Sequence, residues 1–237
     1  MATWITHFII ADKVLEKMPE LDRQNFFVGN IAPDCNLENE DFTSFVPSRE
    51  ITHWMSSDQK NEADSDRFYQ EYIEKREHQI KNTQEKSFLL GYYAHLIVDA
   101  EFPKCMRDEE RISSAWARIK KHHELSQKAE GMFENWDSLK RIIPKSERMK
   151  EIHTLEAEYL EEHLIEDLTE IFNLNFYPDY IDYLPKGAIV RKIGIMRYFP
   201  IKEIDEDSLT AMTKEEYSIF VDCVAEKIVQ KISQNNK

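Results

Sequence analysis

The sequence predicts an all-α fold, a single multi-helix domain over residues 1–237 with one irregular segment near residues 173–207. Three observations carry this prediction. Apolar side chains recur about every 3.6 residues along most of the chain. The 237 residues include only 5 glycines and 8 prolines, and 41% of them are apolar. Finally, there is no internal repeat, no low-complexity tract and no linker rich in glycine or serine that would divide the chain.

The first hundred residues are expected to form helices separated by one long loop. With Thr3 as its N-cap, the first helix carries an apolar stripe that also includes His7. A break at Gly29 and the polar residues that follow indicate an extended loop up to about Pro47. The expected helices are residues 4–18, 48–54, 64–80 and 86–100, of which the last is the most apolar and should be central.

The second half is expected to continue in the same way. The expected helices are residues 107–130, 135–144, 146–172 and 213–232. Gly131 is a reasonable stop for the first of them, and Asn135 caps the second. The glutamates of residues 146–172 lie opposite an apolar stripe and indicate a solvated face. Thr213 and Glu216 form a capping box at the start of the last helix.

Residues 173–207 interrupt the helical pattern. They collect aromatic residues with three prolines and two glycines, which predicts irregular structure or short extended pieces. A long interruption of this kind in a helical protein is often functional, so we expect it to lie over or beside the site described below. The alternative is a surface loop whose aromatic side chains fill a small core of their own.

Composition excludes some classes of function. The formal net charge of −14 excludes indiscriminate nucleic-acid binding, because the average surface field repels phosphate backbones. No apolar run reaches the ~18 residues of a transmembrane segment. The three cysteines have no paired spacing, which favours a reducing compartment, so we expect a cytoplasmic protein.

The most informative motif is the apolar stretch from Phe88 to Phe102, in which His95 and Asp99 are four residues apart on one helix face. This spacing lets an imidazole and a carboxylate bind one cation. A buried carboxylate needs a partner, and a metal ion is one partner that would also hold His95. A buried His–Asp hydrogen bond is the alternative. The chain has a second pair with this spacing, His163 and Asp167, but it lies in a glutamate-rich helix.

Three further residues extend the candidate site. His7 lies on a buried helical stripe, Asp34 follows Pro33 in a turn, and His53 precedes Trp54. Each has an ordinary structural explanation by itself, as a hydrogen-bonded core histidine, a turn residue or a packing residue. Their joint occurrence with the HxxxD motif favours a metal site.

These motifs together resemble the zinc-dependent phospholipase C family, which is similar in fold to the fungal zinc nucleases. The resemblance covers about the first 100 residues, and its strongest part is Gly-Tyr-Tyr-Ala-His95-Leu-Ile-Val-Asp99. It implies an all-helical, zinc-dependent phosphodiesterase. Asp34, His53, His95 and Asp99 would form one zinc site, and His7 with Asp99 part of a second, bridged site. The family's third site needs a histidine with glutamate four residues later, which this chain lacks, so one or two zinc ions are expected.

The resulting hypothesis is a metal-dependent phosphodiester hydrolase acting on a small phosphodiester or a lipid headgroup. Asp34 is the candidate catalytic residue, because a carboxylate near the metal can orient or deprotonate a water. The alternative is a non-catalytic helical protein that keeps a structural metal or a buried His/Asp cluster and acts through a partner surface. A phosphohydrolase of the HD type needs histidine followed directly by aspartate, and none of the 8 histidines has one.

Overall fold

The computed structural model describes residues 2–41, 43–55, 62–163, 165, 167–197 and 209–235. These residues are mainly helical, with one small antiparallel hairpin, so the all-α prediction is confirmed. The chain divides into two compact units: residues 1–101, 165–199 and 222–237, and residues 102–164 and 200–221. No helix in the described part of the chain is long and apolar enough to cross a membrane.

The first unit contains most of the short elements and the candidate site. Its elements are α1 (Trp4–Lys17), α2 (Arg23–Gly29), η1 (Ala32–Asp34), β1 (Leu37–Glu38), β2 (Phe45–Val46), α3 (Arg49–Thr52), α4 (Ser65–Phe68), η2 (Tyr69–Glu74), η3 (Glu77–Gln79), the first part of α5 (Thr83–Met106), α10 (Asp167–Phe172), α11 (Ala188–Met196) and the last part of α12 (Lys214–Asn235). The predicted helix over residues 64–80 is thus a run of α, π and 3₁₀ turns.

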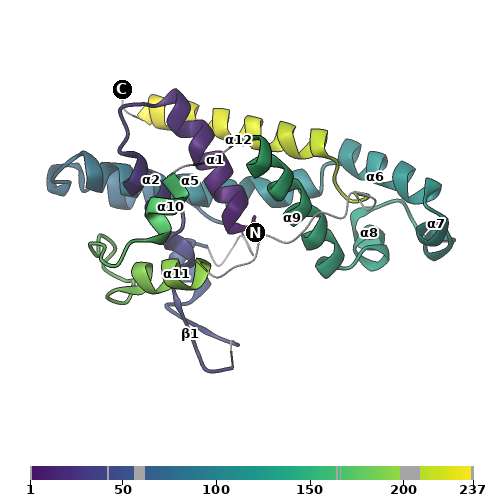
Figure 1. Ribbon diagram of the computed structural model, residues 1–237, viewed down its shortest axis with the longest axis horizontal. Helices are drawn as coiled ribbons and strands as arrows, with labels where there is room; N and C mark the ends of the chain where they lie inside the picture. The colour runs from purple at the N-terminus through teal and green to yellow at the C-terminus, as the bar shows by residue number, and fades with distance from the viewer. Residues whose placement is uncertain are drawn as a thin grey trace. The chain divides into compact units, whose positions relative to one another are not determined.

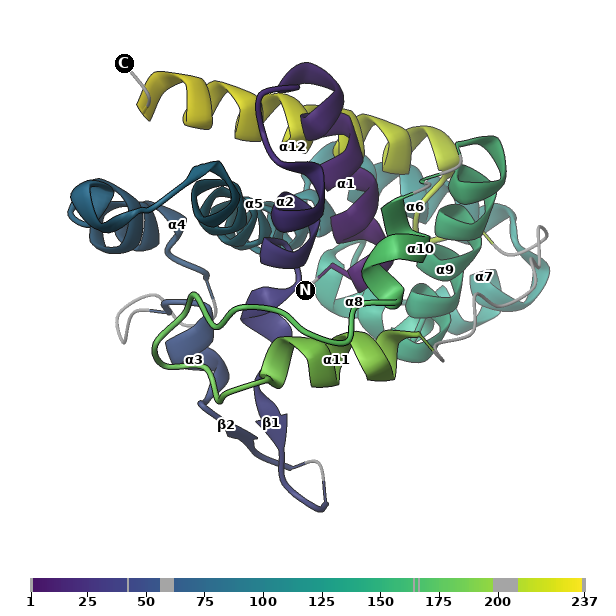
Figure 2. The same cartoon turned by 60° about the vertical axis from the view of Figure 1, so that its left-hand side comes forward.

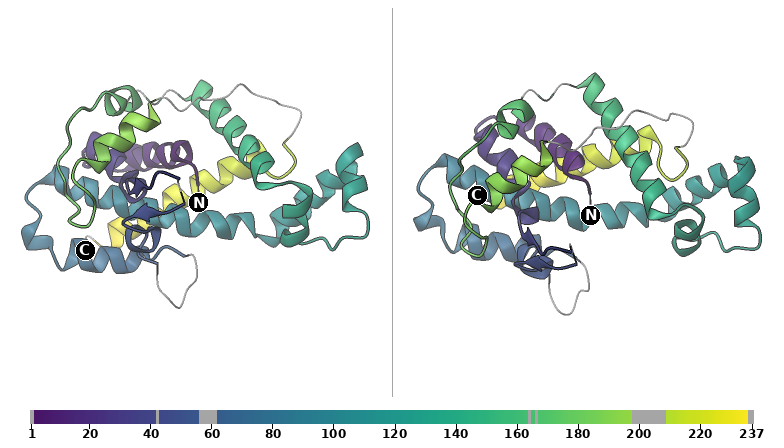
Figure 3. Two further views of the ribbon diagram at one scale, coloured as in Figure 1. Left: turned by 90° about the horizontal axis from the view of Figure 1, so that it is seen from below. Right: turned by 60° about the horizontal axis from the view of Figure 1, so that its bottom comes forward.

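Helix α1 begins where its cap predicts. The side chain of Thr3 accepts a hydrogen bond from the backbone N–H of Thr6, and the apolar stripe of α1 is buried. Helix α1 lies beside residues 222–235 of α12 (Figures 1 and 3). Lys13 and Lys17 of α1 form ion pairs with Asp222 and Glu226 of that segment. The apolar stripe and these pairs together fix the helix that carries His7.

Helix α5 is the central helix, as predicted, and α2 crosses it at close range. The side chains of α5 from Phe88 to Val98 are buried on all sides. A Cβ on Gly29 would clash with the carbonyl oxygen of Phe88, and one on Gly91 would clash with that of Phe26. The two helix backbones can therefore approach only because both positions are glycine.

The segment over residues 173–207 is only partly irregular. Residues 173–187 form neither helix nor strand, whereas residues 188–196 form α11, which corrects the prediction. Gly187, with φ 71°, precedes α11, and the buried residues of α11 recur at helical spacing, a pattern that the surrounding prolines and glycines concealed. Residues 198–207 lie outside the described part of the chain.

A short hairpin follows η1 and leads into α3. Strands β1 and β2 pair antiparallel, with Leu37 opposite Val46 and Glu38 opposite Phe45. Figure 2 shows the hairpin extending away from α3 and α11. Glu38 forms ion pairs with Arg191 and Lys192, so α11 holds the base of the hairpin.

The second unit is a small helical cluster. It contains the end of α5, α6 (Glu109–Lys121), α7 (His123–Ala129), α8 (Trp136–Ile142), α9 (Lys145–Glu162) and the start of α12. Its core is built from apolar residues of α6 and α8, among them Trp116 and Leu139. The caps at Asn135 and Thr213 form as predicted: each side chain accepts a hydrogen bond from a backbone N–H three residues later.

Two predicted long helices are each interrupted in the structure. His122 ends α6 and caps α7, because its Nδ1 accepts hydrogen bonds from the backbone N–H groups of Glu124 and Leu125, both at 3.3 Å. Likewise α9 ends at Glu162, and α10 begins only at Asp167. Apolar periodicity continues across both breaks, which is why it does not reveal them.

The interpretation of the glutamates on residues 146–172 as a solvated face is wrong for two of them. Glu151 and Glu156 are 4% and 1% exposed. The carboxylate of Glu151 accepts hydrogen bonds from the backbone N–H groups of Ala211 (2.7 Å) and Met212 (3.2 Å). It therefore anchors the segment that leads into α12.

Candidate metal centre

The structure brings together all five residues predicted as metal ligands. They come from four elements of the first unit: His7 from α1, Asp34 from η1, His53 from the end of α3, and His95 and Asp99 from α5. Two groups of donor atoms form, each with its atoms within 4.8 Å of one another: His7, His95 and Asp99, and Asp34, His53 and His95. His95 belongs to both groups.

The cluster is withdrawn from solvent. His7 and His53 are fully buried, His95 is 1% exposed and Asp99 is 5% exposed. Burying a carboxylate and three imidazoles is unfavourable unless they find hydrogen bonds or a cation. The chain holds them on the apolar helix α5 and its neighbours, so these polar groups lie inside the core of the first unit.

His95 has a fixed tautomer. Its Nδ1 lies 2.7 Å from the backbone carbonyl oxygen of Asn30, which can only accept, so Nδ1 carries the hydrogen and Nε2 carries a lone pair. Burial lowers the pKa of His95 to about 3, with the nearby His7 contributing in the same direction, so the ring is neutral at pH 7. The carbonyl of Asn30 follows Gly29 directly, so the close crossing of α2 and α5 positions this hydrogen bond.

His53 presents the same nitrogen to the site. Its Nδ1 lies 2.9 Å from the hydroxyl of Thr52, and that hydroxyl donates to the carbonyl oxygen of Arg49 at 3.4 Å. We therefore assign the ring hydrogen to Nδ1 and the lone pair to Nε2. Trp54 comes next with φ 55°, in the left-handed region, and this turn ends α3 at the histidine.

Three other donor atoms lie close to Nε2 of His53. The Nε2 of His53 lies 3.2 Å from Nε2 of His95, 3.5 Å from Oδ1 of Asp34 and 3.4 Å from Oδ2 of Asp99. The His95 Nε2 to Asp99 Oδ2 distance is 3.8 Å. Four ligands about 2.1 Å from a tetrahedral zinc ion are separated from one another by about 3.4 Å. The donor set and its spacing therefore fit a zinc ion.

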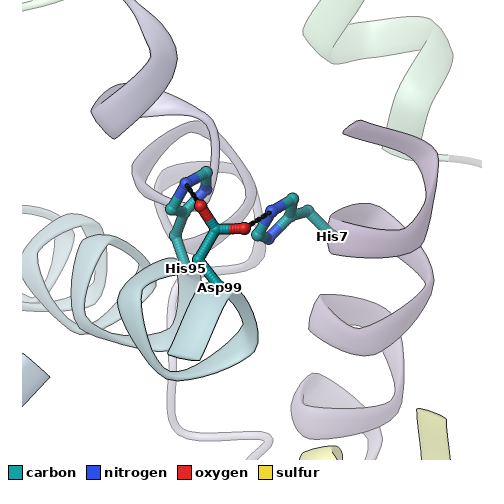
Figure 4. A group of neighbouring side chains, drawn as sticks. All are labelled: His7, His95 and Asp99. Atoms are coloured by element: carbon teal, nitrogen blue, oxygen red, sulfur yellow. Dashed lines mark ion pairs between the residues drawn. The ribbon is translucent and has the colours of Figure 1, made fainter. Parts of the chain in front are cut away.

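Asp99 links the two groups. In Figure 4 one of its carboxylate oxygens faces His95 and the other faces His7. The Oδ1 to His7 Nε2 distance is 3.5 Å, and the rings of His7 and His95 stack with their centroids 3.9 Å apart. Neither ring nitrogen of the buried His7 forms a hydrogen bond with a described residue. An imidazole in that condition fits a ligand role, because a metal ion would use the open nitrogen.

The two carboxylates are held by fixed donors. The indole Nε1 of Trp4 donates to Oδ2 of Asp34 at 3.1 Å, and the backbone N–H of Ala2 donates to Oδ1 of Asp99 at 3.2 Å. Each hydrogen bond holds a carboxylate by a donor from a different part of the chain. Sequence analysis did not identify Trp4 or Ala2 as partners of these acids.

Both carboxylates are ionised. Burial by itself raises the pKa of Asp34, but the polar groups around it, the positively charged Arg49 among them, outweigh burial and hold the pKa below its usual value. Burial likewise raises the pKa of Asp99, but the polar groups that surround the carboxylate outweigh burial and hold the pKa well below its usual value. The site is therefore anionic and suited to a cation.

Arg49 is the main site residue that sequence analysis missed. Its NH2 lies 2.5 Å from Oδ2 of Asp99, and its NH1 lies 3.4 Å from Oδ1 of Asp34. A signal for it exists in the sequence, because Arg49 precedes His53 by four residues and so shares a helix face with it.

Other candidate histidines lie outside the centre. His163 is exposed, and its Nδ1 donates to the carbonyl oxygen of Tyr159 at 3.2 Å. Asp167, four residues later, begins a different helix and pairs with Arg23 instead. His122 serves as a helix cap, as described above. Within the described residues, the two groups of donor atoms contain none of these other histidines.

The described part of the irregular segment lies beside the centre, as expected. The hydroxyl of Tyr183 accepts a hydrogen bond from Nε1 of Trp54 at 3.0 Å and donates to the hydroxyl of Tyr92 at 2.9 Å. Lys192 of α11 lies over the ring of Trp4, 5.4 Å from its centroid. Trp54 follows His53, and Trp4 holds Asp34, so these contacts adjoin the candidate ligands.

Comparison with known proteins agrees with the sequence motifs. Residues 6–102 match the sequence model of a family described as zinc dependent phospholipase C. This range includes all five candidate ligands, so the resemblance is confirmed for this part of the chain. Searches of curated proteins and of solved structures find no match.

Proposed function

We propose that this chain, whose residues 6–102 belong to the zinc dependent phospholipase C family, is a metal-dependent phosphodiester hydrolase. The observation that carries the proposal is the position of His95 Nε2 and two carboxylate oxygens within 3.5 Å of His53 Nε2, close to the separation of neighbouring ligands in a tetrahedral metal site. A proton shared between two of these atoms would remove the repulsion within that pair only, whereas a metal ion could accept lone pairs from all four.

Each ligand would be oriented by a second contact. Asn30 fixes His95, Thr52 fixes His53, and Trp4 fixes Asp34. Such outer contacts set the tautomer and the direction of each donor atom before a metal binds. His7 and Asp99 would hold a second ion, with Asp99 bridging. We therefore expect one or two zinc ions in each chain.

The chemistry follows from what the site can hold. When bound, a divalent ion supplies positive charge against a phosphoryl group and lowers the pKa of a water at the site. Asp34 is the more accessible carboxylate, with its side chain 16% exposed against 3% for Asp99. We therefore assign Asp34 the role of orienting the attacking water through a hydrogen bond to its carboxylate.

The substrate class follows from the family and from the charge of the site. A phosphodiester, either a small molecule or a lipid headgroup, is the substrate that this family indicates. The net charge of −14 does not oppose such a substrate, because cations in the site reverse the local field. We also expect a cytoplasmic location, since Cys35, Cys105 and Cys223 are all unpaired.

Hydrolysis assays test the proposal. The protein is stripped of metal with a chelator, reloaded with zinc or manganese, and assayed on a chromogenic phosphodiester and on phosphatidylcholine vesicles. We expect turnover that depends on the metal and disappears with chelator. A metal-loaded protein that hydrolyses neither substrate would favour the alternative, a non-catalytic protein with a structural metal.

A further inference from the structure

Arg49 occupies the carboxylate oxygens that a metal ion would use. Its guanidinium contacts Oδ2 of Asp99 at 2.5 Å and Oδ1 of Asp34 at 3.4 Å. The same two oxygens face Nε2 of His53, at 3.4 and 3.5 Å. They are therefore the oxygens that would hold a metal ion together with the two imidazoles.

The fold places Arg49 and His53 on the same side of α3. They are four residues apart, and the backbone N–H of His53 donates to the carbonyl oxygen of Arg49 at 2.8 Å. Their side chains differ in exposure, however: Arg49 is 27% exposed, whereas His53 is fully buried. The guanidinium can consequently leave towards solvent without disturbing the buried histidines.

The charges explain why an arginine is useful there. Without a metal ion, the carboxylates of Asp34 and Asp99 repel each other in a largely buried site. In the described structure, Arg49 supplies the guanidinium that contacts both of them. A divalent ion at the same oxygens would repel that guanidinium and compete with it for the same lone pairs.

We propose that Arg49 is an internal counter-cation of the metal-free site, and that a metal ion displaces its guanidinium from Asp34 and Asp99 when it binds. This proposal rests on the proposed function, because it requires a metal at this site. It assigns Arg49 a regulatory effect: the residue stabilises the empty site and weakens metal affinity. The competing possibility is that Arg49 keeps its contacts and orients the carboxylates around the bound metal.

Zinc affinity and thermal stability distinguish these two roles. The variants are Arg49→Gln, which removes the charge, and Arg49→Lys, which keeps the charge but not the two-pronged donor. The matched control is Arg23→Gln, because Arg23 also joins two carboxylates, those of Asp12 and Asp167, away from the site. Zinc affinity is measured against a chromophoric chelator, and thermal unfolding is followed with and without saturating zinc.

We expect Arg49→Gln to bind zinc at least about tenfold more tightly than the wild type. Its melting temperature without metal should fall below that of the wild type, and saturating zinc should abolish this deficit. Arg49→Lys should fall between the two proteins in both measurements. Arg23→Gln should keep wild-type zinc affinity.

The remaining outcomes separate this proposal from the proposed function. If the wild type binds zinc and Arg49→Gln binds it with equal or weaker affinity, the counter-cation role is overturned and the metal site stands. Zinc binding by Arg49→Gln alone supports the counter-cation role and contradicts a zinc enzyme in the wild type. Zinc binding by neither protein overturns both proposals.

Discussion

The Nε2 atoms of His53 and His95 face each other across 3.2 Å, and each presents a lone pair. The contact arises because Asn30 and Thr52 hold the ring hydrogens on the opposite nitrogens. Two facing acceptors repel unless a cation lies between them. Asn30 and Thr52 thus leave the two Nε2 lone pairs facing each other. This arrangement favours a metal ion that Asp34 and Asp99 could also bind.

Asp99→Asn tests the residue that links both donor groups. The change keeps the shape of the side chain, but a neutral amide is a poorer cation ligand and cannot bridge two ions as a carboxylate can. We expect metal content and phosphodiester turnover to fall together, turnover by about 100-fold or more. Metal analysis and hydrolysis assays on the same preparations measure both.

The control for that variant is His163→Ala, because His163 is exposed, belongs to neither donor group, and donates a hydrogen bond to the backbone carbonyl oxygen of Tyr159. It should keep wild-type metal content and turnover. Turnover that survives Asp99→Asn would place the chemistry elsewhere in the molecule.

His95→Ala and His7→Ala should differ in metal content. His95 is shared by both donor groups, whereas His7 belongs to one of them. We therefore expect His95→Ala to lose all bound zinc. His7→Ala should retain the ion held by Asp34, His53, His95 and Asp99. Zinc content per chain decides the point, and equal losses in the two variants would refute the division into a four-ligand site and a bridged second site.

Gly91→Ala tests the link between helix packing and the metal centre. An added Cβ would clash with the backbone carbonyl of Phe26, so α2 must move away from α5, and with it the carbonyl of Asn30 that orients His95. We expect a loss of about 1–3 kcal/mol in the free energy of unfolding, together with weaker zinc binding. Chemical denaturation and zinc titration measure the two effects.

The matched control is Gly194→Ala in α11, where an added Cβ meets no atom within 4 Å. Alanine there should leave stability unchanged or raise it by about 0.5 kcal/mol, because glycine is unfavourable inside a helix. A Gly91→Ala protein as stable as Gly194→Ala would show that the helices do not need this close approach.

Glu151→Gln should change how stability depends on pH. Burial raises the pKa of Glu151 to about 7 from its ordinary 4.5, although hydrogen bonds from three backbone N–H groups, those of Thr210, Ala211 and Met212, oppose the rise. Between these values the folded state holds a proton that the unfolded state has released, so stability falls as pH rises from about 4.5 to about 7. This loss, up to about 3 kcal/mol, should be absent in Glu151→Gln.

Denaturation at a series of pH values measures the difference between the two proteins. Glu147→Gln is the control, since Glu147 is an exposed residue of the same helix that pairs with Lys150. Its pH dependence should match that of the wild type. An identical pH dependence in Glu151→Gln would mean that Glu151 is not protonated in the folded protein at pH 5 to 6.

Much of the fold follows from local patterns in the sequence. Thr3, Asn135 and Thr213 cap helices at the predicted positions, and the apolar stretch of α5 is the central helix. Some errors in helix bounds share one cause, which is that apolar periodicity does not show where one helix ends and the next begins. The cap provided by His122 and the break after Glu162 are examples.

The members of the candidate centre could be predicted, but not their arrangement. The HxxxD motif fixes His95 and Asp99 on one face because a helix fixes that distance. The approach of His7, Asp34 and His53 depends on how α1, η1 and α3 pack on α5, which no spacing encodes. Arg49 was missed because arginine is not a metal ligand, although its spacing from His53 was visible.

The central claim is that Asp34, His53, His95 and Asp99 hold a metal ion. Elemental analysis of protein purified without added metal, expressed as metal per chain, tests it most directly. The account predicts one or two zinc ions per chain in the wild type and none in His95→Ala. A wild-type protein with no stoichiometric metal, even after incubation with zinc and removal of the excess, would contradict it.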